Sequence, residues 1–209
     1  TNAFRQTQLY RALGWDEPAF AHVPLIHGSD GTKMSKRHGS LAVNAYQEMG
    51  FLPSALRNYL LRLGWSHGDE EIISTDKAIE WFDLQGVGRA PSRFDYNKLE
   101  NLNGYYLRGL EDDQAVGLIE PALSERLRHK LTDEQRNRLH TGIAGLKPRA
   151  KTLVQLAENS FFYIAPRPIK IESKAAKFLD DNVKAYLLEL ANELQDITDW
   201  NKENIENLI

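Results

Sequence analysis

The chain has 209 residues, of which 42% are apolar and 26% charged, with a net charge of −3 and no cysteine. This length and composition suit a globular protein of one large or two small domains with a real core. They exclude disulfides and cysteine-ligated zinc, are consistent with a reducing cytosol, and include no run of about 18 apolar residues that would predict a membrane span.

The amino-terminal part predicts a helix followed by a short strand and a turn. Residues 4–13 place their apolar side chains roughly on one side, and Gly14 follows as a natural helix stop. Residues 23–26 form a short apolar run, and because Pro24 lacks an N–H group the run predicts an edge strand or a strand start. The sequence GSDG at 28–31 then predicts a turn.

A cluster of positive charge follows this turn in the stretch GTKMSKRHGS, residues 31–40. Lys33, Lys36 and Arg37 lie within five residues, between two glycines. Ammonium groups on a mobile loop can close on a triphosphate and stabilise the charge that develops on its pyrophosphate, and Ser35 can add a hydroxyl donor. Charge alone leaves open, and favours, a plain basic surface loop or a short electrostatic contact with RNA.

Three further helices are predicted in the middle of the chain. Residues 52–64 have apolar side chains at spacings of three and four, and Pro53 suits the first helical position. Thr75 is predicted to cap the next helix. Asp95 is predicted to cap the third, and the Asn103–Gly104 pair to end it.

The second half is predicted to be almost all helix. Thr132 and Gln135 have the spacing of a capping box, and the sequence APRP at 165–168 predicts a break and a joint between subdomains. Residues 183–197 carry one apolar stripe of helical period, and 196–209 suggest one more helix. The predicted fold class is therefore mainly α with a small α/β part.

Charge is unevenly distributed along this half. Residues 126–151 carry a charge of +6, whereas residues 171–209 carry −5. A block of one sign suggests a polyanionic partner, although a solvated helix surface explains it equally well. The basic block, called here the basic stretch, contains eight cations: Arg126, Arg128, Lys130, Arg136, Arg138, Lys147, Arg149 and Lys151.

The order of short phrases resembles a known family. The motif KMSKR at 33–37 resembles the KMSKS-type signature loop of class I aminoacyl-tRNA synthetases, and its continuation HG resembles the glutamyl-tRNA synthetase form, KLSKRHG. Four other phrases resemble landmarks of that family in the same order: TNAFRQTQLYRALGW, NYLLRLGWSHGDEE, RFDYNKLENLNGYYL and RAKTLVQLAENSFFY. The resemblance covers nearly the whole chain and indicates the bacterial form.

The resemblance implies an ATP-dependent ligase that joins glutamate to tRNA(Glu) through glutamyl-adenylate. Its loop motif assigns a catalytic role to Lys33, Met34, Ser35, Lys36 and Arg37. Lys36 is expected to contact the phosphates of ATP, with Lys33 as its partner. ATP is expected as a substrate together with Mg²⁺, and no bound zinc is expected.

The resemblance also gives the basic stretch a purpose, because Lys and Arg neutralise RNA phosphates. Arg149 and Lys151 are the expected RNA contacts. Three aromatic residues, Trp65, Trp81 and Phe161, could stack on anticodon bases, but their size favours a place in the core.

The family's domain order implies three parts. Residues 1–20 are expected to be the last helix of a Rossmann catalytic domain that is largely missing, residues 21–110 a stem-contact domain, and residues 111–209 a truncated helical anticodon-binding region. The chain contains no HIGH-type motif, the other half of the ATP site in this family. We therefore expect the chain alone to be inactive, and ATP–pyrophosphate exchange by it would contradict this.

Other expectations and alternatives complete the hypothesis. The resemblance implies a cytoplasmic monomer that is not membrane-bound, with tRNA(Glu), ATP and L-glutamate as partners and a glutamate site mostly upstream. One alternative is an enzyme that also charges tRNA(Gln), and another is the glutaminyl enzyme. A third is a non-catalytic RNA-binding module, which a HIGH-type motif upstream of the chain would rule out.

Overall fold

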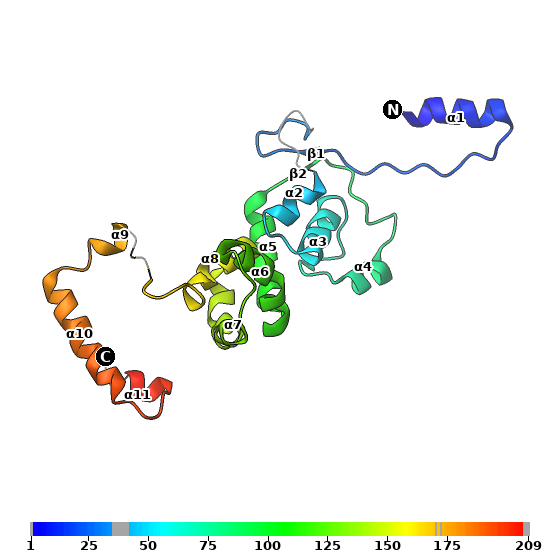
Figure 1. The fold of residues 1–209 in the computed structure, drawn as a ribbon. Coiled ribbons are helices and arrows are strands. Elements are labelled where there is room, and N and C mark those ends of the chain that lie inside the picture. Colours follow the sequence, from blue (N-terminus) through cyan, green and yellow to red (C-terminus); the bar gives the residue numbers. More distant parts are fainter. Residues whose placement is uncertain (1, 35–41, 170, 172, 207–209) are drawn as a thin grey trace. The chain divides into compact units, whose positions relative to one another are not determined.

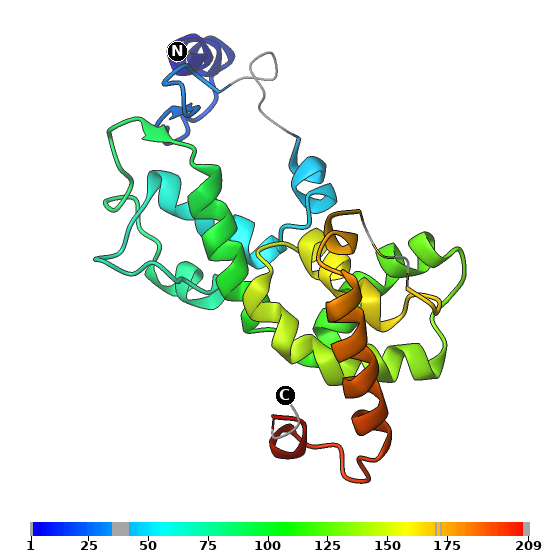
Figure 2. The same cartoon turned by 90° about the vertical axis from the view of Figure 1, so that its left-hand side faces the viewer.

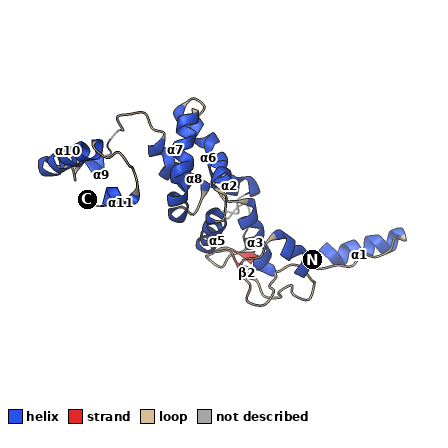
Figure 3. Ribbon diagram, turned by 90° about the horizontal axis from the view of Figure 1, so that it is seen from below, coloured by secondary structure: helices blue, strands red, loops and turns tan. Residues whose placement is uncertain are grey.

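The structure is a computed structural model that describes residues 2–34, 42–169, 171 and 173–206. Helices dominate this part of the chain, with one two-stranded sheet, as Figures 1 and 3 show. This confirms the predicted mainly α class. The chain divides into two units, residues 1–164 and 165–209, and the division coincides with the predicted break at 165–168.

The elements of the first unit alternate briefly between helix and strand and then become entirely helical. In chain order they are α1 (Asn2–Leu13), β1 (Ile26–His27), α2 (Val43–Glu48), α3 (Pro53–Gly64), α4 (Thr75–Trp81), β2 (Ser92–Arg93), α5 (Tyr96–Arg108), α6 (Asp112–Leu127), α7 (Asp133–Leu146), η2 (Lys147–Arg149), α8 (Leu153–Ser160) and η3 (Phe161–Tyr163). The second unit contains α9 (Ser173–Ala176), α10 (Asp181–Gln195) and α11 (Lys202–Glu206).

The sheet is smaller than the apolar run at 23–26 suggests. Strand β1 begins only at Ile26 and pairs in parallel with β2, so that Ile26 lies opposite Ser92 and His27 opposite Arg93. Pro24 lies before the strand, where its missing N–H costs no ladder hydrogen bond. The sheet joins two segments that are more than sixty residues apart in the sequence.

Two clusters of buried side chains form the core of the first unit. An aromatic cluster contains Tyr46, Phe51, Tyr59 and Phe94, with ring centroids 5.0 Å apart for Tyr59 and Phe94. A larger aliphatic cluster is built mainly from α5 to α8, with Leu52 and Ala55 at the start of α3. Helices α6, α7 and α8 pack on one another and lie side by side in Figures 1 and 2. The best-buried large side chains of this aliphatic cluster are Leu107, Ile119, Leu123, Leu139, Ile143 and Leu156.

Backbone contacts at Gly50 join the segment after α2 to the start of α8. The Leu153 N–H group donates to the Gly50 carbonyl at 2.9 Å. Gly50 has a φ of +81°, and a Cβ atom built on it would lie 2.7 Å from the Val154 nitrogen. Only glycine fits this position without moving backbone, since a side chain here would be both strained and in collision.

Helix boundaries confirm some local predictions and correct others. The capping box of Thr132 and Gln135 is present. Thr75 is not a cap: it is the first residue of α4, and the Ser74 hydroxyl accepts the capping hydrogen bond from Lys77. Asp95 caps α5 as predicted, with its carboxylate accepting from two backbone N–H groups.

The prediction that Asn103–Gly104 ends this helix is wrong, because α5 continues to Arg108. Asn103 is fully buried, and its amide makes tertiary hydrogen bonds to the backbone of Leu52 and Lys151. An Asn-Gly pair favours a turn in part because the Asn amide can bond to the nearby backbone. Here distant partners use it, and the helix runs on.

The second unit contains the predicted apolar stripe on α10. This helix spans Asp181–Gln195, so Ile197 of the stripe lies beyond its end, and α10 has no fully buried residue. The additional helix predicted in 196–209 is present as α11. Among the described residues, no helix is long and apolar enough to cross a membrane.

Candidate ATP-phosphate loop and RNA-binding surface

A tight turn forms the root of the basic loop. After β1 the chain reverses, and the Gly28 N–H group donates to the Thr32 carbonyl at 2.8 Å. The Asp30 carboxylate accepts from the Thr32 N–H group at 3.0 Å and from the Thr32 hydroxyl. Gly31 supplies the left-handed conformation, with a φ of +78°. Hydrogen bonds of the backbone and of the Asp30 side chain therefore both stabilise the turn.

This turn fixes the first two residues of the KMSKS-type motif. Lys33 forms an antiparallel bridge with His27, and the Met34 N–H group donates to the Ile26 carbonyl at 3.0 Å. Met34 packs against the aromatic cluster, whereas Lys33 is exposed. The remaining predicted motif residues, Ser35, Lys36 and Arg37, lie outside the described residues.

A further cation lies beside the root of the loop. Arg93 is next to His27 in the sheet, and its Nη2 atom is 3.8 Å from the position that a Cβ atom on Gly31 would take. Sequence reasoning missed Arg93, because it is sixty residues from the motif and only the pairing of β1 with β2 brings it there. It has no acidic partner among the described residues.

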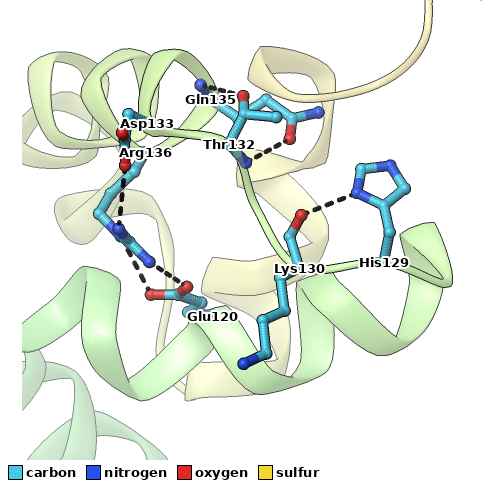
Figure 4. Close-up of polar contacts among 7 residues, drawn as sticks. All are labelled: Glu120, His129, Lys130, Thr132, Asp133, Gln135 and Arg136. Carbon is cyan, nitrogen blue, oxygen red and sulfur yellow. Dashed lines mark hydrogen bonds and ion pairs between the residues drawn. The ribbon is translucent and has the colours of Figure 1, made fainter.

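The structure divides the basic stretch into paired and unpaired cations. Arg136 forms an ion pair with Glu120 and Arg138 one with Glu134, so two of the eight cations are neutralised in place. Figure 4 shows the first pair beside the Thr132 capping box, and also His129 contacting the Lys130 carbonyl. The charge of +6 therefore overstates what this surface offers to a polyanion.

Lys147 has a structural role. Its ammonium group is 2.6 Å from a carboxylate oxygen of Asp112 and donates to the Leu110 carbonyl, and its side chain is only 12% exposed. The pair joins η2 to the first turn of α6. A cation placed in this way cannot also reach a ligand.

Arg149 and Lys151, the predicted RNA contacts, are exposed on either side of the buried Ala150. Neither side chain has an ion-pair partner among the described residues. A Cβ atom built on Gly104 would lie 3.7 Å from the Lys151 Cα atom and 3.3 Å from the Arg108 Nη1 atom, so both residues lie beside Gly104. The end of α5 thus adds Arg108 to this basic surface, which sequence reasoning did not anticipate.

The three aromatic residues considered for base stacking have different environments. Trp65 is 4% exposed, and its indole N–H group donates to the Asp83 carbonyl at 3.1 Å, so it belongs to the core as expected. Trp81 stacks on His67 with ring centroids 4.5 Å apart. Phe161 packs against the aliphatic cluster, with the Arg126 guanidinium 3.6 Å from its ring centroid.

Comparison with known proteins assigns a family to both halves of the chain. Residues 1–101 match the catalytic domain of the class I tRNA synthetases (E and Q), and residues 116–209 match an anticodon binding domain. The chain is 54% identical over 208 residues to glutamate–tRNA ligase 2 of Rhodospirillum rubrum, a match that covers 100% of this chain. The chain belongs to the glutamyl-tRNA synthetase family.

Other members of the glutamyl-tRNA synthetase family agree with this assignment. Glutamate–tRNA ligase 2 of Paramagnetospirillum magneticum is 54% identical over 208 residues. A crystal structure of a glutamate–tRNA ligase from Elizabethkingia meningosepticum, in complex with its amino acid, is similar with a TM-score of 0.74 and 28% identity over 98% of this chain. This chain spans 44% of the length of each of the two curated relatives and 43% of the solved chain.

No cluster of three or more His, Asp or Glu side chains suited to a metal lies among residues 2–34, 42–169 and 173–206. The exposed ammonium group of Lys33 has the charge and the hydrogen-bond donors that suit phosphate oxygens.

Proposed function

We propose that this chain is part of a glutamate–tRNA ligase and supplies one side of its ATP site together with surfaces for tRNA(Glu). The observation that carries the proposal is the 54% identity with glutamate–tRNA ligases over the length of the chain. The anchored position of Lys33 and the exposed Arg149 and Lys151 support it.

Lys33 and Lys36 act in the first step. A carboxylate oxygen of glutamate bonds to the α-phosphorus of ATP while the bond from that phosphorus to its bridging oxygen breaks. Pyrophosphate leaves with the electron pair, so negative charge grows on the leaving group. Two ammonium groups beside it stabilise the transition state more than bound ATP. A hydroxyl oxygen of the terminal adenosine of the tRNA then bonds to the acyl carbon, the bond from that carbon to the phosphate oxygen breaks, and AMP leaves.

The domain roles follow the family pattern. Residues 1–20 end the Rossmann domain, residues 21–110 form the stem-contact domain that carries the loop, and residues 111–209 form part of the anticodon-binding region. Glutamate binds mostly outside this chain. The full protein acts in the cytoplasm as a monomer, with ATP, Mg²⁺, L-glutamate and tRNA(Glu).

This proposal predicts that the 209-residue chain alone does not catalyse ATP–pyrophosphate exchange with glutamate and tRNA present. The chain holds only one of the two ATP motifs, and positioning both sides of the phosphates is what lowers the barrier. A radioactive pyrophosphate exchange assay measures this directly. The full-length protein is the positive control. Exchange by the 209-residue chain above background would contradict the proposal that the ATP site needs a second motif from outside this chain.

Removing the two exposed cations beside Ala150 tests the RNA surface. The double substitution Arg149→Ala and Lys151→Ala in the full-length protein should reduce the slope of log K against log[salt] for tRNA binding by about 1 to 2, because each phosphate contact contributes about 0.7 to 0.9. Filter binding between 50 and 200 mM salt gives the slope. Arg138→Ala, which removes a cation already paired with Glu134, is the matched comparison and should leave the slope unchanged. If the double variant and Arg138→Ala have the same salt slope, Arg149 and Lys151 do not contact RNA phosphates and are ordinary solvated surface residues.

A further inference from the structure

A cavity of about 460 Å³ lies between α3 and α4 in the first unit. The two helices contact each other and are neighbours in Figure 1. Most of the cavity wall is apolar and comes from Leu61, Ile73, Ala78, Ile79 and Phe82. A concave site of this size with a mostly apolar lining is typical of the sites in which proteins bind small molecules.

Both ends of α4 are fixed to α3 and its surroundings. Before the helix, the side chain of Asn58, which is 2% exposed, accepts from the Ile73 N–H group at 3.0 Å and donates to the Glu71 carbonyl at 3.2 Å. After the helix, the ring of Phe82 contacts that of Trp65, with centroids 5.8 Å apart. Because the two ends are held in this way, the middle of α4 cannot move toward α3 and fill the space. The cavity is therefore preformed.

The apolar walls of this cavity are open to solvent. Ile79 is 75% exposed and Phe82 is 49% exposed, although both side chains are large and apolar. An apolar body that covers them removes their surface from water, and this favours binding in proportion to the area covered. The cavity therefore suits a ligand with an apolar body.

One cation without a partner lies at the same cavity. Arg57 lines it and is exposed, and it has no acidic partner among the described residues. None of the described lining residues is itself acidic. A guanidinium group can donate two parallel hydrogen bonds to a carboxylate, and the Thr75 hydroxyl on the same wall offers a further donor. A single positive charge matches a ligand that carries one negative charge.

We propose that the cavity between α3 and α4 binds a small amphipathic carboxylate. The apolar body of the ligand lies against Ile73, Ala78 and Phe82, and its carboxylate accepts hydrogen bonds from Arg57. The bound ligand stabilises the packing of α4 on α3. This site is independent of the proposed function, because neither ATP nor RNA takes part in it.

Titration of the full 209-residue chain with 4-phenylbutyrate tests the proposal. This probe has a phenyl ring, a short aliphatic chain and one carboxylate. The signal to follow in ¹⁵N-resolved NMR spectra is the indole N–H group of Trp65, because its ring contacts Phe82 in the cavity wall. We expect a saturable shift of this signal with a Kd of about 1 mM or below, which is typical for a ligand of about 12 non-hydrogen atoms.

Two variants and one uncharged analogue separate the charged contact from the apolar one. Arg57→Gln should raise the Kd for 4-phenylbutyrate about three- to fivefold, the range of a solvent-exposed ion pair. Arg89→Gln is the matched control, since Arg89 is exposed in the same unit and does not line the cavity. The alcohol 4-phenylbutan-1-ol has no charge, so its Kd should be the same in the unsubstituted chain and in Arg57→Gln.

Filling the cavity should prevent binding altogether. Ala78→Leu places a larger side chain in the cavity wall and should abolish the saturable shift for both the acid and the alcohol. Ala144→Leu, at an exposed position of α7, is the matched control and should leave the Kd unchanged. Thermal melting checks the fold of each variant.

Three results would overturn the proposal. The first is the absence of a saturable Trp65 shift up to about 10 mM 4-phenylbutyrate in the folded, unsubstituted chain. The second is an equal Kd for the acid in Arg57→Gln and Arg89→Gln, which would show that the site does not select a carboxylate. The third is unchanged binding to a folded Ala78→Leu variant, which would place the ligand elsewhere.

Discussion

Substituting Lys33 by alanine in the full-length protein is expected to lower the turnover of ATP–pyrophosphate exchange about 100-fold, the loss typical when one transition-state donor is removed. The turn at Gly28–Thr32 and the bridge to His27 hold the Lys33 backbone in place. The ammonium group is exposed and is not used in an ion pair among the described residues. Its removal should therefore cost little stability.

The kinetic pattern distinguishes a catalytic role from general attraction of ATP. A group that acts mainly on the leaving pyrophosphate lowers kcat while the KM for ATP changes little. The variant Lys33→Arg keeps the charge and should recover part of the rate. Lys77→Ala, which removes an exposed lysine placed over Trp81, is the matched control and should leave kcat unchanged. Equal kcat values for the Lys33→Ala and Lys77→Ala enzymes would show that Lys33 does not act in the reaction.

Substituting Asn103 by leucine is expected to lower the free energy of unfolding by about 3 kcal/mol, because two backbone groups lose their partners in a buried place. The Asn103 Oδ1 atom accepts from the Leu52 N–H group at 2.7 Å, and its Nδ2 atom donates to the Lys151 carbonyl at 2.5 Å. This one side chain connects the start of α3, the middle of α5 and the segment before α8. Leucine has a similar size but offers no hydrogen bond.

Urea unfolding of the 209-residue chain, followed by circular dichroism, measures this effect. The matched control is Asn97→Leu, on the exposed first turn of the same helix, which should change the free energy by no more than about 0.5 kcal/mol. Since Asn103 also positions Lys151, the Asn103→Leu variant should bind tRNA more weakly at temperatures where it remains folded. Equal stability of the two variants would mean that water replaces both lost bonds.

Local signals in the sequence predicted two helix caps whose partners are neighbouring residues, but they placed the cap of α4 one residue too late, at Thr75 instead of Ser74. The capping box at Thr132 and the cap at Asp95 depend on groups within three residues, and both are present. The start of α3 at Pro53 likewise follows from the fixed φ of proline. The KMSKS-type motif together with four further phrases in the same order predicted the family, and the comparisons confirm it.

Tertiary partners explain what the sequence did not predict. The Asn103–Gly104 pair was predicted to end the helix because its neighbours in the sequence do not reveal the hydrogen bonds that Asn103 makes to Leu52 and Lys151. The basic stretch looked uniformly available, yet Lys147 is held by Asp112, and Arg136 by Glu120. Arg93 reaches the loop root only because two short strands pair across the chain. Such features depend on which segments meet, and no spacing within one segment encodes that.

The measurement that tests the central claim most directly is the attachment of radioactive glutamate to tRNA(Glu) by the full-length protein, with and without the Lys33→Ala substitution. We expect ATP-dependent charging by the unsubstituted protein, and an initial rate about 100-fold lower for the Lys33→Ala variant. Absence of charging by the folded, unsubstituted protein would contradict the proposed enzyme and favour a non-catalytic RNA-binding module. Charging that is unaffected by the substitution would contradict the role assigned to this loop.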